Sequence, residues 1–224
     1  MPSIRTRMLL GFVLANFAVA AVAAVLLLGR EPSPPAIQGV FLPQAKALDE
    51  FTLLDHHGEA FNREDLQGGW HLVSYGFTTC PDICPTTLVE LDSMKAALGP
   101  DGDDLQILFY SVDHRRDTVH QLATYIPYFN PDFVGLTHRD NPENPHLPFE
   151  RSLGIISELV PSDDPKAGPQ DYSVQHGVTL FLLNPEGQLQ AIFKPVRGEN
   201  GLPHFQPEQL AGDYLSIRDY VADS

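Results

Sequence analysis

The chain has 224 residues and carries 14 basic against 29 acidic side chains, for a formal charge of −15 at pH 7. Residues 1–30 contain Arg5, Arg7 and Arg30 and no acid, so the remaining 194 residues hold 11 basic and 29 acidic side chains, a balance of −18. That balance excludes nucleic acid as a partner, because a polyanion would be repelled. Two cysteines are too few for a small disulfide scaffold, whereas 43% hydrophobic residues suffice for a core.

An apolar run opens the chain, from Met8 to Gly29, with Asn16 as its polar interruption. As a helix it would reach about 30 Å, the thickness of the hydrocarbon core of a bilayer. A cleavable signal peptide is the alternative, but its apolar region is shorter, about 7–15 residues. We therefore expect residues 8–29 to form a single transmembrane anchor. Arginines on both sides of the run, with two before it, favour a cytoplasmic N-terminus over residues 1–7.

The segment that follows, residues 30–44, contains four prolines and little apolar periodicity. It is predicted to be an extended tether, which leads to one domain of about 180 residues over 45–224. In a bacterial cell, the anchor would hold this acidic domain at the periplasmic face of the inner membrane, where thiols can be oxidised.

Strand and helix patterns alternate within the domain. The order of strand, helix, strand and helix, followed by a hairpin and a closing helix, predicts an α/β sandwich with a mixed central β-sheet. That order is compatible with a thioredoxin-like fold. The expected elements, in chain order, are strands 51–54, 58–61 and 70–77, helix 85–98, strand 105–112, helix 118–128, strand 133–136, helix 149–154, a hairpin of strands 179–183 and 188–193, and a last helix that begins near residue 206.

Both cysteines fall between the strongest strand and the helix after it, in the sequence Cys80-Pro81-Asp82-Ile83-Cys84. The unpaired N–H groups of a helix N-terminus favour thiolate, the form that metal binding and disulfide exchange both need. At positions i and i+4 of a helical turn, the two sulfurs would project from one face and could chelate a soft ion such as Cu(I) or close a disulfide. Burial as small apolar side chains is the alternative, but these are the only cysteines and they fall together at one helix start.

His176 is the candidate third ligand among the nine histidines, because it stands in the loop that leads into strand 179–183. In a thioredoxin-like sheet that loop lies against the thiol pair. Thioredoxins place a cis-proline there, but no proline occurs between Pro169 and Pro185, and Val178 holds the position. A dedicated disulfide reductase would be expected to keep that proline and a C-x-x-C motif. The residues therefore favour a copper site, for Cu(I) or for Cu(II) with a further donor, made of Cys80, Cys84 and His176.

Several stretches of the sequence carry a family resemblance over most of residues 45–222. They resemble the Sco/SenC family of membrane-tethered copper chaperones for cytochrome c oxidase. The stretch YGFTTCPDICPTTL, residues 75–88, is similar to the copper motif of that family; Ser111-Val112-Asp113 with Arg116-Asp117-Thr118 is similar to its second signature; and residues 171–176, DYSVQH, are similar to its histidine loop.

The resemblance implies a thioredoxin-like fold in which Cys80, Cys84 and His176 bind one copper ion. It also implies delivery of copper to, or maintenance of the thiols of, the dinuclear copper centre in cytochrome c oxidase subunit II. The family usually has Asp just before the histidine, where this chain has Gln175. Asp171 or Asp113 is then the candidate carboxylate for orienting the imidazole.

Two other functions stay open on the sequence. A thiol-disulfide oxidoreductase would use Cys80 and Cys84 as a redox pair, since Cα atoms one helical turn apart lie in the usual disulfide range of about 4.4–6.8 Å. A redox or copper sensor would need a membrane partner to carry its signal. Enzymatic activity is therefore an open question, and a copper metallochaperone is favoured over an enzyme.

Overall fold

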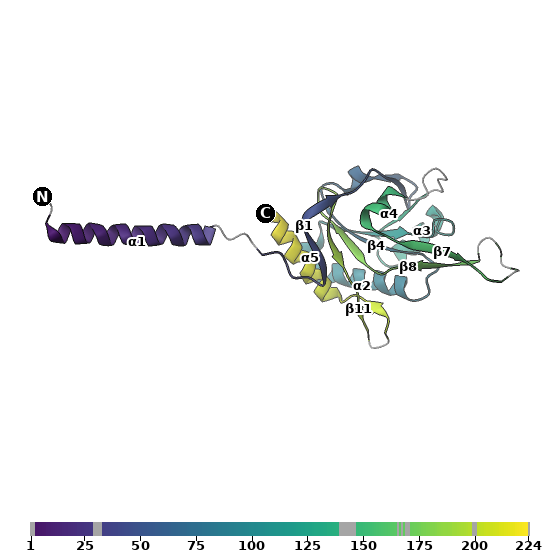
Figure 1. The fold of residues 1–224 in the computed structure, drawn as a ribbon. Helices are drawn as coiled ribbons and strands as arrows, with labels where there is room; N and C mark the ends of the chain where they lie inside the picture. The colour runs from purple at the N-terminus through teal and green to yellow at the C-terminus, as the bar shows by residue number, and fades with distance from the viewer. Residues whose placement is uncertain are drawn as a thin grey trace.

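The computed structural model describes residues 3–28, 33–138, 147–164, 166, 168, 171–198 and 201–223. Figure 1 shows one long helix, α1, followed by a domain that is built on a central sheet. In chain order the elements are α1 (Ile4–Leu28), β1 (Gly39–Ala47), β2 (Thr52–Asp55), β3 (Ala60–Asn62), β4 (Trp70–Gly76), α2 (Ile83–Leu98), β5 (Leu105–Ser111), α3 (Val119–Tyr125), β6 (Val134–Thr137), α4 (Pro148–Leu153), β7 (Ser157–Pro161), β8 (Tyr172–His176), β9 (Leu180–Leu183), β10 (Gln188–Phe193), β11 (Val196–Arg197), β12 (Pro203–His204) and α5 (Pro207–Ala222).

The central sheet of the described residues has eight strands in the order β1-β10-β9-β4-β5-β6-β2-β3. Strands β4, β5 and β6 are parallel to one another, and the other pairs are antiparallel, so the predicted mixed sheet is confirmed. Helix α2 connects β4 to β5, and α3 connects β5 to β6. The carboxyl ends of these strands and the N-termini of both helices therefore meet at one edge of the sheet.

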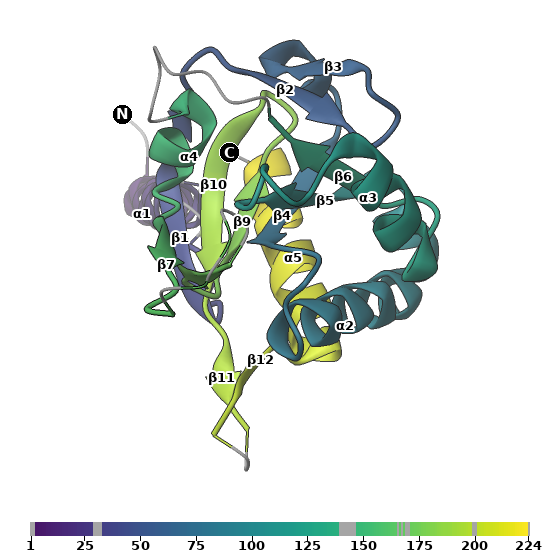
Figure 2. The ribbon, with the colours of Figure 1, turned by 90° about the vertical axis from the view of Figure 1, so that its right-hand side faces the viewer.

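Both faces of β4 and β5 are buried, which explains why most residues of these two segments are apolar. Leu72 and Phe109 face a cluster that side chains of α2, α3 and α5 complete. Val73 and Tyr110 face a second cluster, to which α4 contributes Phe149. Figure 2 shows α4 on one side of the sheet and helices α2, α3 and α5 on the opposite side. The alternation of side chains along these strands thus builds two cores from one sheet.

Three features of the sheet region differ from the sequence prediction. Strand β1 pairs with β10 along the sheet edge, so the folded domain begins at Gly39, within the predicted tether and ahead of residue 45. The hairpins β7–β8 and β11–β12 were not predicted at all. The strands at 70–76 and 105–111 and the hairpin β9–β10 lie where the sequence predicts them.

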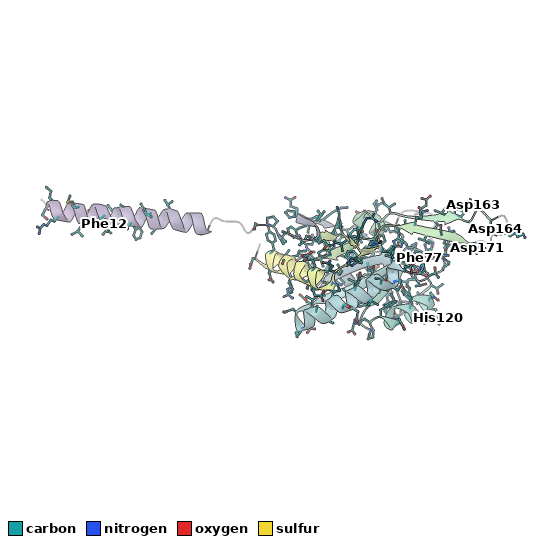
Figure 3. The ribbon with its side chains drawn as sticks, turned by 90° about the horizontal axis from the view of Figure 1, so that it is seen from below. Phe12, Phe77, His120, Asp163, Asp164 and Asp171 are labelled. Atoms are coloured by element: carbon teal, nitrogen blue, oxygen red, sulfur yellow. The ribbon has the colours of Figure 1, made fainter. Side chains whose placement is uncertain are left out.

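Helix α1 covers most of the predicted anchor, residues 8–29. The apolar side chains of residues 8–22 are exposed; Phe12, labelled in Figure 3, is 70% exposed. Among the residues that the structure describes, however, no helix has both the length and the apolar character needed to cross a membrane. The predicted transmembrane helix is therefore not borne out by the fold.

Candidate metal centre

Cys80 and Cys84 lie between β4 and α2, as predicted, but only Cys84 belongs to the helix, which begins at Ile83. Cys80 stands in the preceding turn, and the backbone N–H of Cys84 donates to its sulfur over 3.5 Å. The predicted placement of both sulfurs on one helical face is wrong for a steric reason: Cys80 precedes Pro81, and a residue before proline is pushed out of the helical region. The Cys80 sulfur instead satisfies an N–H group of the first turn of α2.

The two thiols differ in exposure and in protonation. Cys84 is buried, with 4% of its surface exposed, whereas Cys80 is half-buried. The Cys84 thiol donates a hydrogen bond to Cys80, and this bond is the main reason that the pKa of Cys80 lies far below its ordinary value, against the opposing effect of burial. The same bond, together with burial, raises the pKa of Cys84. At neutral pH the pair therefore consists of a Cys80 thiolate and a Cys84 thiol.

His176 is the last residue of β8 rather than part of a loop, and its Nε2 lies 3.9 Å from Sγ of Cys84. Its Nδ1 lies 2.7 Å from the carbonyl oxygen of Gly177. Because a carbonyl oxygen only accepts, Nδ1 carries the ring proton, and Nε2 presents a lone pair to the thiols. The rings of Tyr75 and Phe77 contact the imidazole edge to face, with centroid distances of 5.5 and 5.6 Å.

The structure thus brings together the three residues that the sequence singles out, and their donor atoms suit a soft ion. An ion bonded to sulfur at about 2.3 Å and to imidazole nitrogen at about 2.0 Å, with trigonal angles, sets those two atoms about 3.7 Å apart. The distance between Cys84 Sγ and His176 Nε2 is 3.9 Å. Within the described part of the chain, no three Cys, His, Asp or Glu side chains already stand in metal-binding geometry. In this form the Cys84 sulfur lies beside the imidazole, and the Cys80 sulfur accepts the backbone N–H of Cys84.

Two glycines, which have no side chain of their own, leave room at the site for the Cys84 thiol and the Tyr75 ring. A β-carbon on Gly76, the last residue of β4, would lie 2.5 Å from Sγ of Cys84. A β-carbon on Gly177 would lie 2.8 Å from the hydroxyl of Tyr75, which also contacts Thr179 at 3.2 Å. Any larger residue at either position would displace the thiol or the aromatic wall of the site.

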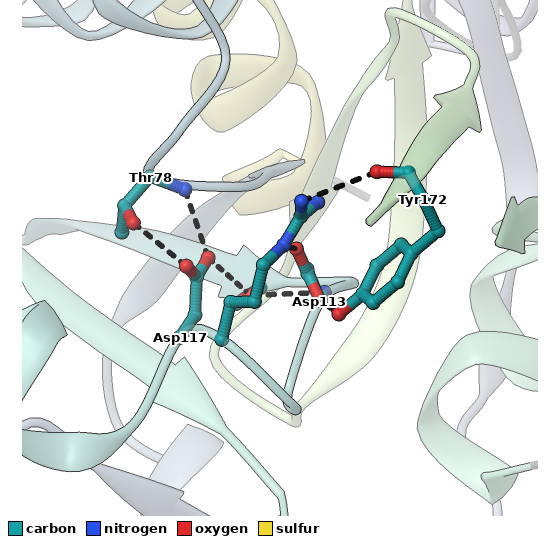
Figure 4. A network of polar contacts seen from close by, with 6 residues as sticks. Thr78, Asp113, Asp117 and Tyr172 are labelled. Carbon is teal, nitrogen blue, oxygen red and sulfur yellow. Dashed lines mark hydrogen bonds and ion pairs between the residues drawn. The ribbon is translucent and has the colours of Figure 1, made fainter. Parts of the chain in front are cut away.

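Asp117, fully buried after β5, fixes the turn that carries Cys80 (Figure 4). Its carboxylate accepts hydrogen bonds from the backbone N–H of Thr78, at 2.8 Å, and from the Thr78 hydroxyl, at 2.7 Å. The hydroxyl of Ser111 donates a third, at 2.7 Å. Burial raises the pKa of Asp117, and the hydrogen bonds from Ser111 and Thr78 oppose that rise. The carboxylate thereby ties the turn before the thiols to the end of β5.

Asp113 makes the matching connection to the strand that carries His176 (Figure 4). The hydroxyl of Tyr172, at the start of β8, donates to its carboxylate at 2.5 Å, and Arg116 pairs with the same carboxylate at 2.5 Å. Arg116 also donates to the backbone carbonyl of Tyr172, at 3.2 Å, and its guanidinium lies 4.1 Å from the centre of the Tyr172 ring. Residues 111–117 therefore hold the thiol turn and the histidine strand at once.

The two carboxylates that the sequence offers for orienting His176 do not contact it. Asp113 is bound to Tyr172 and Arg116. Asp171 precedes β8 at the end opposite to His176, five residues or about 16 Å away along an extended strand, near Asp163 and Asp164 (Figure 3). The Gly177 carbonyl takes that role instead, so the carboxylate prediction is wrong.

From the sequence alone, Ser111, Arg116 and Asp117 have no role beyond the family resemblance, and the network that they form with Asp113 is not predicted. A physical signal for it exists in the sequence. Strands β4 and β5 are adjacent and parallel, so the residues after each one meet at the same sheet edge. Polar residues directly after the second strand are therefore candidates for holding the thiol turn after the first.

These features define a thioredoxin-like domain with a C-x-x-x-C thiol pair and an imidazole beside it. Comparisons with known proteins agree. A family model described as SCO1/SenC matches residues 42–202, well over half of the sequence. The chain belongs to the SCO1/SenC family.

Individual relatives share different lengths with this chain. A putative copper-binding protein of Stutzerimonas stutzeri is 35% identical over 172 residues, which cover 76% of this chain and 80% of that protein. The mitochondrial SCO2 homologue of Danio rerio is 37% identical over 140 residues, which cover 62% of this chain and 48% of that protein. The chain thus spans about half the length of this mitochondrial relative. The crystal structure of Arabidopsis thaliana ScoI with copper bound matches with a TM-score of 0.61 at 29% identity, over 77% of this chain and 99% of that one.

The replacement Asp117→Asn tests whether the hydrogen bonds that Asp117 accepts stabilise the turn before the thiols. All three groups that face the carboxylate are donors, so a carboxamide NH₂ leaves at least one of them without an acceptor. We expect the free energy of unfolding, measured by chemical denaturation, to fall by about 1–3 kcal/mol. The exposed Asp163→Asn serves as the control and should unfold like the wild type. Equal stability of the two variants would show that the hydrogen bonds of Asp117 do not stabilise the fold.

Proposed function

We propose that this chain binds one copper ion through Cys80, Cys84 and His176 and serves the assembly of cytochrome c oxidase. In this proposal it delivers copper to, or maintains the thiols of, the dinuclear copper centre in subunit II. The observation that carries the proposal is the distance of 3.9 Å between Nε2 of His176 and the buried Sγ of Cys84, beside the half-buried Cys80, whose pKa is lowered. The bacterial relative is named for copper binding, and the Arabidopsis structure contains copper, which supports the choice of ion.

The chemistry of the site suits a cargo ion that must be both held and released. Thiolates and imidazole select soft ions such as Cu(I) over Mg²⁺ or Ca²⁺. Cys80 is half-buried and already ionised, so it is the sulfur that an incoming ion meets first. Cys84 and His176 then complete the set from the protein side. The recipient in this proposal follows from the family resemblance of residues 45–222.

Ligand replacements test the metal site. Cys80→Ala, Cys84→Ala and His176→Ala should each weaken Cu(I) affinity by more than about a hundredfold, since even residues behind the ligands of metal sites change affinity by about 10–100-fold. A competition titration against a coloured Cu(I) chelator, with the reduced full chain, measures this. His120→Ala is the matched control, because this exposed imidazole on α3 lies outside the site (Figure 3). A His176→Ala chain with unchanged affinity would remove the three-ligand model.

A thiol-disulfide oxidoreductase is the second candidate, because an ionised half-exposed cysteine beside a buried thiol is also an arrangement suited to disulfide exchange. An experiment with one recipient protein, a purified copper-binding domain of an oxidase subunit II, distinguishes the two proposed functions. We expect the Cu(I)-loaded chain to transfer copper to the reduced recipient, measured by the copper content of the two proteins after their separation. Weak copper binding, with rapid reduction of the oxidised recipient by the metal-free chain, would favour the oxidoreductase.

The location remains a proposal from the sequence. We propose that residues 8–29 anchor the chain in the bacterial inner membrane and that the domain lies in the periplasm, with residues 1–7 in the cytoplasm. The finding that no described helix could cross a membrane counts against the anchor, so the measurement is decisive. Expressed in a bacterium, the full chain should stay with the membrane fraction after a high-salt wash, and its domain should be digested by protease added to spheroplasts. Recovery in the soluble fraction would reject the anchor.

A further inference from the structure

A cleft of about 440 Å³ lies beside the turn that carries Cys80. One wall is the first turn of α2 with the residue before it, and it includes Asp82 and Ile83. The other wall is the hairpin β11–β12, with Leu202 and His204. Figure 2 shows this hairpin projecting from the domain beside α2. Pockets of about 300–1,000 Å³ are typical of binding sites, so the cleft is large enough to receive side chains of another molecule.

The hairpin wall is attached to α2 by Glu90. One oxygen of its carboxylate accepts the backbone N–H of Phe205 at 2.9 Å, and the other lies 3.9 Å from Nδ1 of His204. The Phe205 ring is buried in the core cluster to which α2 and α5 contribute. The two walls are therefore held relative to each other, and the cleft is a fixed part of the fold.

The cleft lies where a protein that takes an ion from the site has to approach. Asp82 and Ile83 stand between Cys80 and Cys84 in the sequence. Of the two sulfurs, Cys80 is half-buried and Cys84 is buried. A donor atom of a second protein therefore reaches the ion past Cys80, and the surface around that atom covers the neighbouring turn, which is one wall of the cleft.

The walls determine the chemistry of what fits. Leu202 is 44% exposed, and Ile83 is partly exposed, so an apolar side chain between them would remove apolar surface from water. Asp82 is exposed, and its carboxylate makes no capping hydrogen bond to α2. Residues 31–224 hold 11 basic and 29 acidic side chains, which repel an acidic segment and attract a basic one.

We propose that this cleft is the docking site for the protein that receives the copper ion. A segment of the recipient places an apolar side chain between Ile83 and Leu202 and a basic side chain over Asp82. The proposal rests on the proposed function and adds to it a partner surface that supplies no ligand to the ion. Docking at this surface brings the donor atoms of the recipient next to Cys80.

The replacement Leu202→Ser tests the apolar wall. The full chain is loaded with Cu(I), mixed with a reduced copper-binding domain of an oxidase subunit II and separated from it at set times, and the copper in each protein is measured. Transfer at low recipient concentration should slow about tenfold, because truncating a central apolar contact weakens docking by that order. The Cu(I) affinity of the variant, measured by competition with a chelator, should equal that of the wild type.

Val40→Ser is the matched control, because Val40 is also 44% exposed but lies on β1, at the edge of the central sheet. This variant should match the wild type in both the rate of transfer and the affinity.

The replacement Asp82→Asn tests the charge. Salt screens the attraction between charges, so transfer from the wild type should slow as the NaCl concentration is raised, and transfer from Asp82→Asn should slow less. Each protein is compared with itself at low and high salt, so a difference in copper affinity between the two proteins does not enter the comparison.

A wild-type rate of transfer from Leu202→Ser, or an equal salt dependence of Asp82→Asn and the wild type, would overturn the docking site and leave the three-ligand site intact. A wild-type chain that binds copper but passes none to this recipient would overturn the assigned partner. A wild-type chain that binds no copper would instead overturn the proposed function, and the role of the cleft with it.

Discussion

Two fully buried carboxylates, Asp117 and Asp113, hold the two segments that carry the chemistry, and the rest of the site depends on the hydrogen bonds that they accept. The thiols come from the turn after β4, and the imidazole comes from the end of β8, far along the chain. Loops of that separation do not hold atoms at fixed distances by themselves, because ordering them costs conformational entropy. Residues 111–117 offset this loss of entropy with charge-assisted hydrogen bonds, each stronger than a neutral one. The geometry of the donor atoms is thus a property of β5 as much as of the cysteines.

The unequal protonation of the two sulfurs follows from the same arrangement. Pro81 keeps Cys80 out of the helix, and this lets the Cys80 sulfur accept from the first turn of α2. Cys84, the second residue of α2, is buried against Gly76, and burial helps it keep its proton. The two sulfurs are therefore not equivalent towards an ion: Cys80 favours the thiolate form, whereas Cys84 would first have to give up its proton.

The sequence predicts the mixed sheet and the place of the thiol pair at a helix start, because these depend on local patterns. Buried parallel strands are mostly apolar, and the C-x-x-x-C motif comes shortly after the first of them. What it does not predict depends on contacts between distant segments. Strand β1 contains Pro43 and exposed positions, and it forms a strand because its backbone pairs with that of β10. His176 is a different case, because its orientation comes from the carbonyl of the next residue, Gly177, and not from any acidic residue that a pattern could mark.

The pairing of β1 with β10 also has a consequence for how the domain can be handled. Strand β10 lies between β9 and β1, and its residues Gln190, Ala191 and Phe193 are buried there. A fragment that starts at residue 45 would remove most of β1 and leave a long apolar strand with a free row of backbone donors and acceptors. Such edges pair with other chains and promote aggregation. The smallest well-behaved fragment of this protein therefore begins ahead of Gly39.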